Sequence, residues 1–255
     1  MNGLLMNEPP DTLSGKTALV TGASRRLGRA IALALAHQGA GIVVHYNRSE
    51  QAADALCAEL RRMGTSAYRI QADLSETNQA ERLFESAAAQ AGPIDVLINN
   101  ASIFDQETIW ETTDTSLQHN LQIHSVAPLM LARSLARQDR PAQIVNLLDT
   151  RVTVYDREHA SYHLSKRVLL TLTRMLALEL APTITVNAVA PGLILPPAGQ
   201  DESYLEKLAH CNPLNRYGCP DDVAAAVLFL LRSRFVTGQV IYVDGGHHMK
   251  GHMYD

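Results

Sequence analysis

A tyrosine and a lysine four positions apart are the side chains in this sequence best suited to acid–base chemistry. Tyr162 and Lys166 lie in the stretch Ser-Tyr-His-Leu-Ser-Lys, and on a helix this spacing places both on one face. A tyrosine has an ordinary pKa of ~10, so it is poorly ionised near neutral pH. An ammonium group beside it favours the phenolate, and we expect Lys166 to lower the pKa of Tyr162. The pair predicts a proton donor or relay, although exposed Tyr–Lys pairs with no chemical role share the same spacing.

A glycine turn near the start of the chain is suited to holding an anion. An apolar, partly β-branched run ends at Thr21-Gly22, and a helical apolar pattern follows with Gly28 near its start. Gly22 would let the backbone turn and approach a ligand, and Gly28 would let the helix pack near the strand. The first turn of a helix presents free N–H groups, and a dinucleotide pyrophosphate is the usual anion there. A glycine turn without a ligand is the alternative, because the spacing is not G-x-G-x-x-G.

The residues after the second predicted strand indicate which dinucleotide binds. The segment His45-Tyr46-Asn47-Arg48-Ser49 contains no Asp or Glu. An acidic side chain here would accept a hydrogen bond from the ribose 2′-hydroxyl of NAD, whereas an arginine suits the 2′-phosphate of NADP. Arg48, with Arg25 and Arg26 in the glycine turn, therefore favours NADP. The alternative is that these arginines are solvated surface side chains.

Two more segments follow predicted strands. Asp73, within Ala72-Asp73-Leu74, is placed either to accept from an adenine amino group or to cap the next helix. The side chains of Asn99-Asn100-Ala101-Ser102 are small and would let a cofactor approach the backbone, although a turn explains the Asn-Asn pair equally well.

The elements that must position these residues alternate along the chain. Short β-branched runs predict strands at Ala18–Thr21, Gly41–Tyr46, Ala67–Gln71, Val96–Asn99, Gln143–Leu148, Thr183–Val189 and Gln239–Val243. Longer Ala/Leu/Arg/Glu stretches predict helices at Leu27–Gln38, Glu50–Met63, Thr77–Ala91, Leu117–Arg137, Ala160–Leu180 and Asp222–Arg232. This alternation predicts an α/β fold with one doubly wound Rossmann domain and a parallel sheet of about seven strands. We assign residues 15–248 to that domain and residues 1–14 and 249–255 to tails. One long irregular connection, Pro191 to Ser203, follows a strand, where ligand-binding loops occur.

The composition limits the class of protein and its partners. The 255 residues are 46% hydrophobic, which supports a substantial core. A net charge of −4 argues against nucleic acid as the main partner, and no apolar run approaches the ~20 residues that a membrane span needs. The first residues lack the pattern of a secretory signal. The three cysteines cannot all form disulfides with one another, and their spacing is not that of a zinc site. The expected location is therefore a reducing cytoplasm. We interpret His247, His248 and His252 as a solvated tail rather than a metal site.

Taken together, these residues resemble the short-chain dehydrogenase/reductase family. The match extends from about Lys16 to His248. It rests on the motifs Thr21-Gly22 followed by Gly28, Asn99-Asn100-Ala101, Tyr162-x-x-x-Lys166, Pro191-Gly192 and Val243-Asp244-Gly245-Gly246. The resemblance implies that NADP(H) is bound by Gly22, Arg25, Arg26, Leu27, Gly28, His45, Tyr46, Asn47, Arg48, Ser49, Asp73, Leu74, Asn100, Ala101, Ser102, Tyr162, Lys166, Pro191, Gly192 and Ile194. The family's last helix and strand commonly build subunit contacts, so the stretches Ala224-Ala225-Ala226-Val227 and Phe229-Leu230 imply a homotetramer.

At several positions the sequence differs from the common family pattern, and there it resembles the pteridine reductase branch of the family. That branch includes bacterial dihydromonapterin and dihydrofolate reductases. Arg26 replaces the middle glycine of the turn, Asp149 stands where the catalytic serine is usual, and Phe104 follows Asn-Asn-Ala-Ser. The stretches Gln122-Ile123-His124 and Ala190-Pro191-Gly192-Leu193-Ile194-Leu195 are similar to the bacterial members.

The branch implies a role for each of these side chains. Phe104 would stack on a pterin and hold it against the nicotinamide, unless it is a core or loop anchor. Arg26 and Ser102 would contact the pterin or the cofactor phosphates. Asp149 and Tyr162 would bind the pterin and supply the proton, while Lys166 would hold the nicotinamide ribose. A carboxylate at Asp149 suits a polarised N–H, whereas a hydroxyl suits a ketone. The alternatives are that Asp149 is a helix N-cap or a surface carboxylate.

Two residues are candidates for the family's proton-relay position in this sequence. Alignment on Ala127-Pro128 places His124 where the family often has a catalytic Asn. Asn120, one turn earlier, is the alternative, and a histidine satisfied within its helix is another.

Three functions are compatible with these residues. The leading hypothesis is NADPH-dependent reduction of a dihydropterin, such as dihydromonapterin, dihydrobiopterin or dihydrofolate, to the tetrahydro form. A carbonyl or 3-oxoacyl reductase of the same family is the second hypothesis, and a non-catalytic NADP-binding regulator is the third. The presence of both Tyr162 and Lys166 argues against the regulator.

Overall fold

The computed structural model describes residues 13–155, 157–197 and 199–252, with the backbone alone described at 251 and 252. The predicted N-terminal tail up to residue 12, and residues 253–255 of the predicted C-terminal tail, lie outside the described residues.

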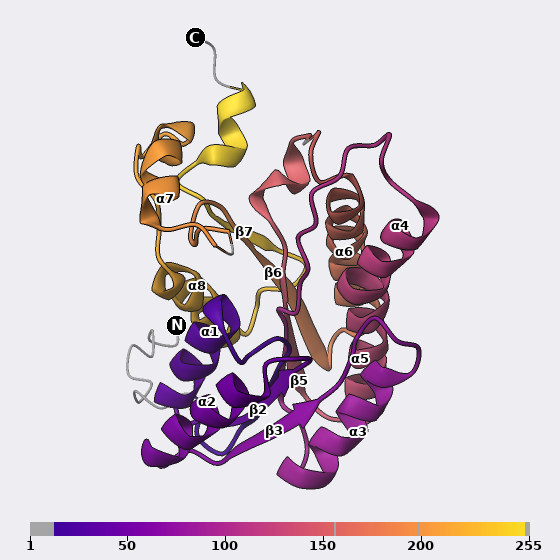
Figure 1. The fold of residues 1–255 in the computed structure, drawn as a ribbon. Coiled ribbons are helices and arrows are strands. Elements are labelled where there is room, and N and C mark those ends of the chain that lie inside the picture. The colour runs from indigo at the N-terminus through magenta and orange to yellow at the C-terminus, as the bar shows by residue number, and fades with distance from the viewer. Residues whose placement is uncertain (1–12, 156, 198, 253–255) are drawn as a thin grey trace, which may run out of the picture.

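One parallel sheet forms the centre of the molecule (Figure 1). Its strands are β1 (Thr17–Val20), β2 (Gly41–Tyr46), β3 (Ala67–Gln71), β4 (Val96–Asn99), β5 (Ala142–Leu147), β6 (Ile184–Pro191) and β7 (Val240–Val243). They pair in the order β3-β2-β1-β4-β5-β6-β7, so the chain reverses its direction of travel across the sheet between β1 and β4. Open α/β sheets bind ligands at the carboxyl ends of their strands beside such a reversal. The predicted doubly wound sheet is confirmed.

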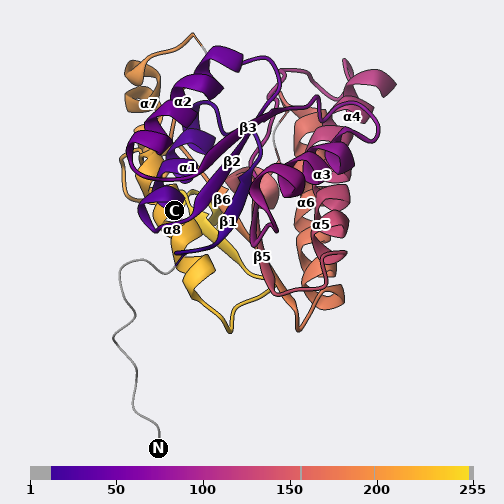
Figure 2. The same ribbon diagram turned by 90° about the horizontal axis from the view of Figure 1, so that it is seen from below.

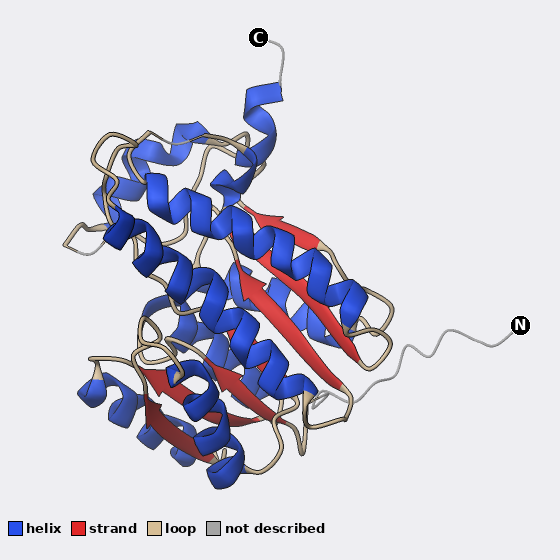
Figure 3. Ribbon diagram, turned by 90° about the vertical axis from the view of Figure 1, so that its right-hand side faces the viewer, coloured by secondary structure: helices blue, strands red, loops and turns tan. Residues whose placement is uncertain are grey.

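Helices cover both faces of the sheet, so its strands are rich in buried apolar residues. One layer contains α1 (Arg26–His37), α2 (Glu50–Arg62) and α8 (Pro220–Arg232); the other contains α3 (Gln79–Ala91), α4 (Asp114–Leu121), α5 (Ala127–Ala136) and α6 (Ala160–Glu179). Figure 2 shows the two layers on opposite sides of the strands, and Figure 3 looks onto the layer with α4, α5 and α6. A separate buried apolar cluster fills each layer. No helix in the described part of the chain is both long and apolar enough to cross a membrane.

The predicted helix Leu117–Arg137 is wrong as a single helix. It begins earlier, at Asp114, and a wider π-helical turn, Gln122–Val126, separates α4 from α5. Turns of this kind often occur at functional sites. Here the turn faces α6, where Ser125 Oγ donates to the Ser165 carbonyl oxygen at 2.9 Å.

The predicted irregular stretch from Pro191 to Ser203 is shorter than expected. Strand β6 continues to Pro191, and α7 (Glu202–Leu208) begins before the stretch ends. Asp201 caps α7, because its carboxylate accepts from the Ser203 N–H at 3.0 Å. In Figure 1, α7 lies beside the C-terminal turn, beyond the ends of the strands.

Two expectations about the C-terminal region need correction. His247 and His248 are not in a solvated tail: His247 Nδ1 lies 2.8 Å from the Cys211 carbonyl oxygen, and His248 Nδ1 lies 2.9 Å from Asp244 Oδ2. The predicted subunit contact on α8 is also partly wrong, since Ala224, Val227 and Leu230 are buried in this chain's own core. Phe229 remains more than half exposed.

Candidate active site

Asp149 and Tyr162 come together at the carboxyl end of β5. Asp149 follows the strand and caps a short 3₁₀ turn, Thr150–Thr153, because its Oδ1 accepts from the Arg151 N–H at 2.8 Å. Tyr162 lies in the first turn of α6 and donates its hydroxyl proton to Asp149 Oδ2 at 3.0 Å. The structure therefore places the tyrosine and the carboxylate in direct contact.

The predicted decrease in the pKa of Tyr162 is wrong. Burial of the hydroxyl and the negative charge of Asp149 raise the pKa of Tyr162 well above its ordinary value. At neutral pH Tyr162 is therefore a phenol with a proton to give, rather than a phenolate.

Lys166 lies on the same face of α6, as its spacing predicted, but its ammonium group is directed to the backbone. Its Nζ donates to the Leu147 carbonyl oxygen at 2.7 Å and lies 5.6 Å from the centroid of the Tyr162 ring. Burial lowers the pKa of Lys166 to about 8, and the charge of Asp149 opposes that decrease. Lys166 therefore carries a positive charge beneath the tyrosine at neutral pH.

His124 supports the site from the π-helical turn. Its Nε2 accepts from the Ile103 N–H at 3.2 Å, so the ring proton lies on Nδ1, which is 2.8 Å from Ser165 Oγ. The Ser102 hydroxyl also contacts Nε2, at 2.9 Å. Burial, followed by the charge of Lys166, lowers the pKa of His124 well below its ordinary value, so the ring is neutral. Both nitrogens are thus engaged in positioning the loop after β4 against α6.

Asn120, the other candidate for the relay, is also buried. Its Nδ2 donates to the Ser116 carbonyl oxygen within α4 at 3.1 Å. Its Oδ1 has no hydrogen-bond partner among the described residues. The structure brings neither Asn120 nor His124 into hydrogen-bond contact with Tyr162 or Lys166 in the described part of the chain.

Phe104 lies beside the tyrosine and is held by an aromatic neighbour. Its ring stacks on His159 with centroids 3.9 Å apart, and it meets the edge of Tyr162 at 4.8 Å. The loop that carries Phe104 is attached to the start of α6, because the Glu107 N–H donates to the Glu158 carbonyl oxygen at 2.7 Å. Phe104 remains 46% exposed, which leaves part of the ring open to a ligand.

A cavity of about 690 Å³ lies among these side chains, within the usual size range of small-molecule sites. Its lining includes all the side chains predicted to touch a substrate, namely Arg26, Ser102, Phe104, Asp149 and Tyr162. Sequence reasoning missed several other lining residues, namely Arg151, Tyr204, Leu208, Cys211 and His247. It also missed His159 behind Phe104. The helix that carries Tyr204 and Leu208 could have been predicted from the sequence. Asp201 is a typical N-cap residue, and apolar residues at helical spacing follow it.

The glycine turn after β1 is closely packed. The Gly22 N–H donates to Nδ1 of the buried His45 at 3.0 Å, and His45 Nε2 lies 3.1 Å from the Ala72 carbonyl oxygen. A Cβ atom on Gly28 would lie 2.3 Å from the Gly22 carbonyl oxygen, so only glycine fits there. Asn100 Nδ2 donates to the Thr21 carbonyl oxygen at 2.8 Å and so attaches the segment after β4 to this turn. His45 and Asn100 therefore shape the turn through side chains that are already engaged.

Arg26 occupies a backbone position that glycine usually fills. Its φ is +51°, in the left-handed region, which explains why the family pattern has glycine here. The guanidinium donates to the Pro196 carbonyl oxygen at 2.6 Å, and this contact joins the glycine turn to the loop after β6.

The edge of the sheet fits a dinucleotide phosphate. Arg25, at the N-cap of α1, makes no side-chain cap hydrogen bond, so the first amide groups of the helix are available to an anion. Arg25, Arg26, Asn47 and Arg48 are exposed along this edge, and Ser49 and Leu27 are partly exposed. The donor set is cationic and contains no acid between residues 45 and 49, as a 2′-phosphate requires.

The remaining predicted cofactor residues are placed around this edge. Asp73 Oδ1 accepts from the Ser75 N–H at 3.0 Å, while Asn78 occupies the N-cap of α3, so Asp73 is not the cap of that helix. Tyr46 is buried, and its hydroxyl accepts from Arg69 at 2.6 Å. The side chains of Leu74 and Ile194 are buried, whereas Ala101, Pro191 and Gly192 are partly exposed.

The chain is similar to known oxidoreductases both in sequence and in structure. The chain matches a family model described as enoyl-(acyl carrier protein) reductase over residues 22–248. It is 37% identical over 243 residues to an uncharacterized oxidoreductase of Methylorubrum extorquens, with 92% of this chain and 98% of the relative covered. It is 36% identical over 249 residues to a 3-oxoacyl-[acyl-carrier-protein] reductase of Staphylococcus aureus, with 92% and 98% covered. Among solved structures, FolM alternative dihydrofolate reductase 1 from Brucella suis, in complex with NADP, matches with a TM-score of 0.89 and 33% identity, covering 96% of this chain and 98% of that one.

Proposed function

This chain belongs to the short-chain dehydrogenase/reductase family, and from that premise we propose that it reduces a dihydropterin with NADPH. The observation that carries the proposal is the contact between the Tyr162 hydroxyl and the carboxylate of Asp149, beside a half-exposed Phe104. Asp149 stands where the family usually has a hydroxyl, and a carboxylate accepts from the N–H groups that a pterin presents.

The cofactor is NADP(H). The amide groups at the start of α1 would bind its pyrophosphate, and Arg48, with Arg25, would bind the 2′-phosphate. Lys166 would contact the nicotinamide ribose. When bound, NADPH supplies a hydride to the carbon of a C=N bond in the substrate.

Tyr162 supplies the proton for the adjacent ring nitrogen. Its raised pKa keeps the hydroxyl protonated, and Asp149 holds that hydroxyl in position. An N–H group of the pterin would donate to Asp149, which frees the tyrosine O–H to point at the ring nitrogen. The charge of Lys166 then stabilises the phenolate that remains.

Phe104 positions the flat ring of the substrate. The stack on His159 occupies one side of the Phe104 ring, and its exposed remainder faces the cavity with Tyr162. Aromatic faces pair well with a planar heterocycle, so Phe104 would hold the pterin within reach of Tyr162.

A carbonyl or 3-oxoacyl reductase is the second candidate, supported by the relative from S. aureus. Against it stands Asp149, because a carboxylate cannot donate a hydrogen bond to a ketone oxygen. A non-catalytic NADP-binding regulator would have no need of the partly buried contact between Tyr162 and Asp149.

Steady-state kinetics with NADPH and two substrate sets test the proposal. We expect turnover of dihydrobiopterin, dihydromonapterin or dihydrofolate and little turnover of 3-oxoacyl thioesters. Turnover of the thioesters without turnover of any dihydropterin would establish the second candidate instead. An Asp149→Ser variant should gain ketone reduction, because serine restores the donating hydroxyl.

A cytoplasmic homotetramer is part of the same proposal. The three cysteines are free thiols, as expected in a reducing compartment. Light scattering coupled to size-exclusion chromatography measures the assembly.

A further inference from the structure

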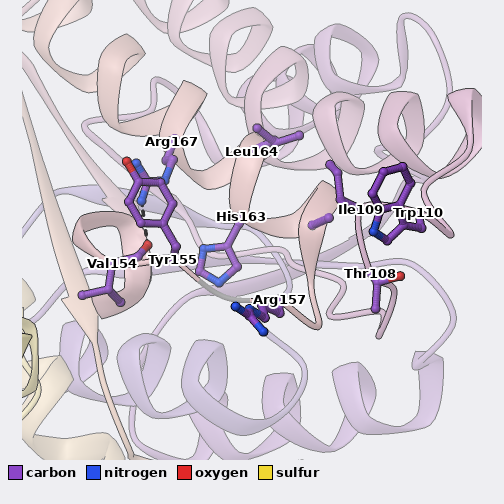
Figure 4. A pocket seen from close by; sticks show the side chains of 10 residues that line it. Thr108, Ile109, Trp110, Val154, Tyr155, Arg157, His163, Leu164 and Arg167 are labelled. Carbon is purple, nitrogen blue, oxygen red and sulfur yellow. Dashed lines mark hydrogen bonds between the residues drawn. The ribbon is translucent and has the colours of Figure 1, made fainter.

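The catalytic cavity continues past Phe104 toward the surface. A second cavity, of about 680 Å³, shares with it Phe104, Arg151, Pro197, Tyr204 and His247. A third cavity, of about 600 Å³, shares with the second Val154, Tyr155 and Arg157. We call the second and third cavities together the exit groove, and Figure 4 shows its outer end. A substrate held at Tyr162 can therefore extend along this groove.

The exit groove is rich in positive charge. Arg151 lies at its inner end, Arg157 lies where the two cavities meet, and Arg167 lies at its outer end. Among the described residues that line the groove, Glu158 is the one acid, and it already accepts from Gln106 Nε2 at 3.5 Å. The groove therefore favours an anion over a cation.

Arg157 is the guanidinium most available to a ligand. It forms no hydrogen bond or ion pair with any residue in the described part of the chain. Arg167, by contrast, is engaged: it donates to the Val154 carbonyl oxygen at 2.6 Å and lies over the Tyr155 ring, 4.6 Å from its centroid. In Figure 4, Tyr155 lies next to Arg167 and Arg157 lies near His163.

The walls of the exit groove are also aromatic. Tyr155 and Trp110 are both more than nine-tenths exposed, although such large side chains are usually at least partly covered. Tyr204 and the stacked pair of Phe104 and His159 line the inner part. Exposed aromatic faces beside a cavity suit a ligand that contains a flat ring.

We propose that the exit groove binds the side chain of the substrate, and that this side chain contains an aromatic ring and ends in a carboxylate that Arg157 binds. Dihydrofolate has this chemistry, whereas a dihydropterin with a short hydroxylated side chain does not. The inference rests on the proposed function and specifies its substrate class. An arginine binds a carboxylate through two parallel hydrogen bonds, so Arg157 would determine specificity without touching the reacting ring.

Kinetics with a matched pair of substrates test this assignment. In Arg157→Gln, we expect KM for dihydrofolate to rise about 5-fold with little change in kcat, as for a partly exposed charged contact. The same variant should reduce dihydrobiopterin as the wild type does. Arg157→Lys should recover part of the loss, and Arg62→Gln, on the exposed end of α2, is the matched control.

Binding gives a readout that does not depend on turnover. Calorimetric titration of the NADP-loaded protein compares methotrexate, which has a benzoylglutamate side chain, with a 2,4-diaminopteridine that lacks it. Arg157→Gln should weaken methotrexate about 5-fold and leave the smaller pteridine unchanged, and added salt should reduce the difference.

The outcomes separate this inference from the proposed function. Turnover of dihydrobiopterin, with no effect of Arg157→Gln on dihydrofolate or methotrexate, overturns the carboxylate site and leaves the pterin reductase standing. Failure of every dihydropterin overturns both. If a second copy of the chain covers the groove, Arg157→Gln would change the mass of the assembly and affect both substrates equally, which also overturns the inference.

Discussion

The proton on Tyr162 lies between two neighbours of opposite charge. Asp149 accepts it at 3.0 Å and opposes ionisation, while Lys166 lies beneath the ring with its ammonium group on the Leu147 carbonyl oxygen. The negative neighbour is in direct contact and the positive one is not, so the phenol is stabilised in the resting protein. In the proposed mechanism, Tyr162 keeps its proton until an N–H group of the substrate donates to Asp149 in place of the tyrosine.

Removing the phenol should abolish proton supply but leave the cofactor site intact. We expect Tyr162→Phe to lower kcat for a dihydropterin at least 100-fold, the usual minimum for loss of a positioned proton donor. The dissociation constant for NADPH, measured by fluorescence titration, should change less than about 3-fold, because the ring and the glycine turn remain. A variant that keeps more than a tenth of wild-type kcat would show that another group supplies the proton.

Asp149 should also set the alkaline limit of activity, through Lys166. The pKa of Lys166 is about 8, so the ammonium form is lost as the pH rises through that value, and kcat/KM should fall there. The charge of Asp149 raises the pKa of Lys166, so its removal in Asp149→Asn should move this fall to lower pH.

The pH profile of residual activity in Asp149→Asn measures the shift, and Asp221→Asn on α8 is the control carboxylate. An alkaline limit that stays in place would mean that Lys166 does not titrate in this range.

Among the secondary-structure elements, the strands could be predicted from the sequence more accurately than the helices. Strand ends came within two residues of prediction because buried β-branched runs and glycine turns mark them locally. The π-helical turn at Gln122–Val126 has no such local mark, since it depends on contacts between His124, Ser125 and Ser165 across two helices. Likewise, the spacing of Tyr162 and Lys166 predicted their shared face, but the partner carboxylate, Asp149, lies after the end of β5, and only the folded chain brings it near.

The left-handed residue at the start of α1 offers a test of what Arg26 does. A non-glycine residue at φ +51° is strained by about 1 kcal/mol, and glycine is not. Arg26→Ala loses the contact with the Pro196 carbonyl oxygen and keeps the strain, whereas Arg26→Gly loses both. We therefore expect the free energy of unfolding, measured by urea denaturation, to be about 1 kcal/mol higher for the glycine variant than for the alanine variant. Equal stabilities would show that the backbone relaxes at this position, and both variants should bind a pterin more weakly than the wild type.

For the whole molecule, the alternation of predicted strands and helices was enough to predict the fold. It was not enough to predict which segments form the far wall of the cavity. The order of strands places the glycine turn and the Asn-Asn segment side by side at the reversal between β1 and β4, as a doubly wound sheet requires. The far wall of the cavity comes from α7 and from the C-terminal turn around His247, whose packing depends on contacts distant in sequence. The interpretation of that turn as a tail failed for this reason.

The buried side chain of His45 ties the stability of the whole molecule to pH. Burial lowers the pKa of His45 to about 4, from an ordinary value of 6.5 that the unfolded chain retains. Between these values the unfolded state binds more protons than the folded state, so the free energy of unfolding must fall as the pH falls from 6.5 to 4. The difference corresponds to a loss of about 3 kcal/mol.

Replacing this histidine by a residue that accepts but does not titrate should remove that loss. In His45→Gln, the amide oxygen can still accept from the Gly22 N–H, and we expect a cost of about 1 kcal/mol at pH 7 from imperfect geometry. Between pH 6.5 and 4 the variant should then lose about 3 kcal/mol less than the wild type, as measured by urea denaturation followed by circular dichroism. The buried His124 contributes equally to both proteins and cancels in the comparison. Parallel stability curves for the two proteins would place the acid sensitivity elsewhere and remove His45 from this role.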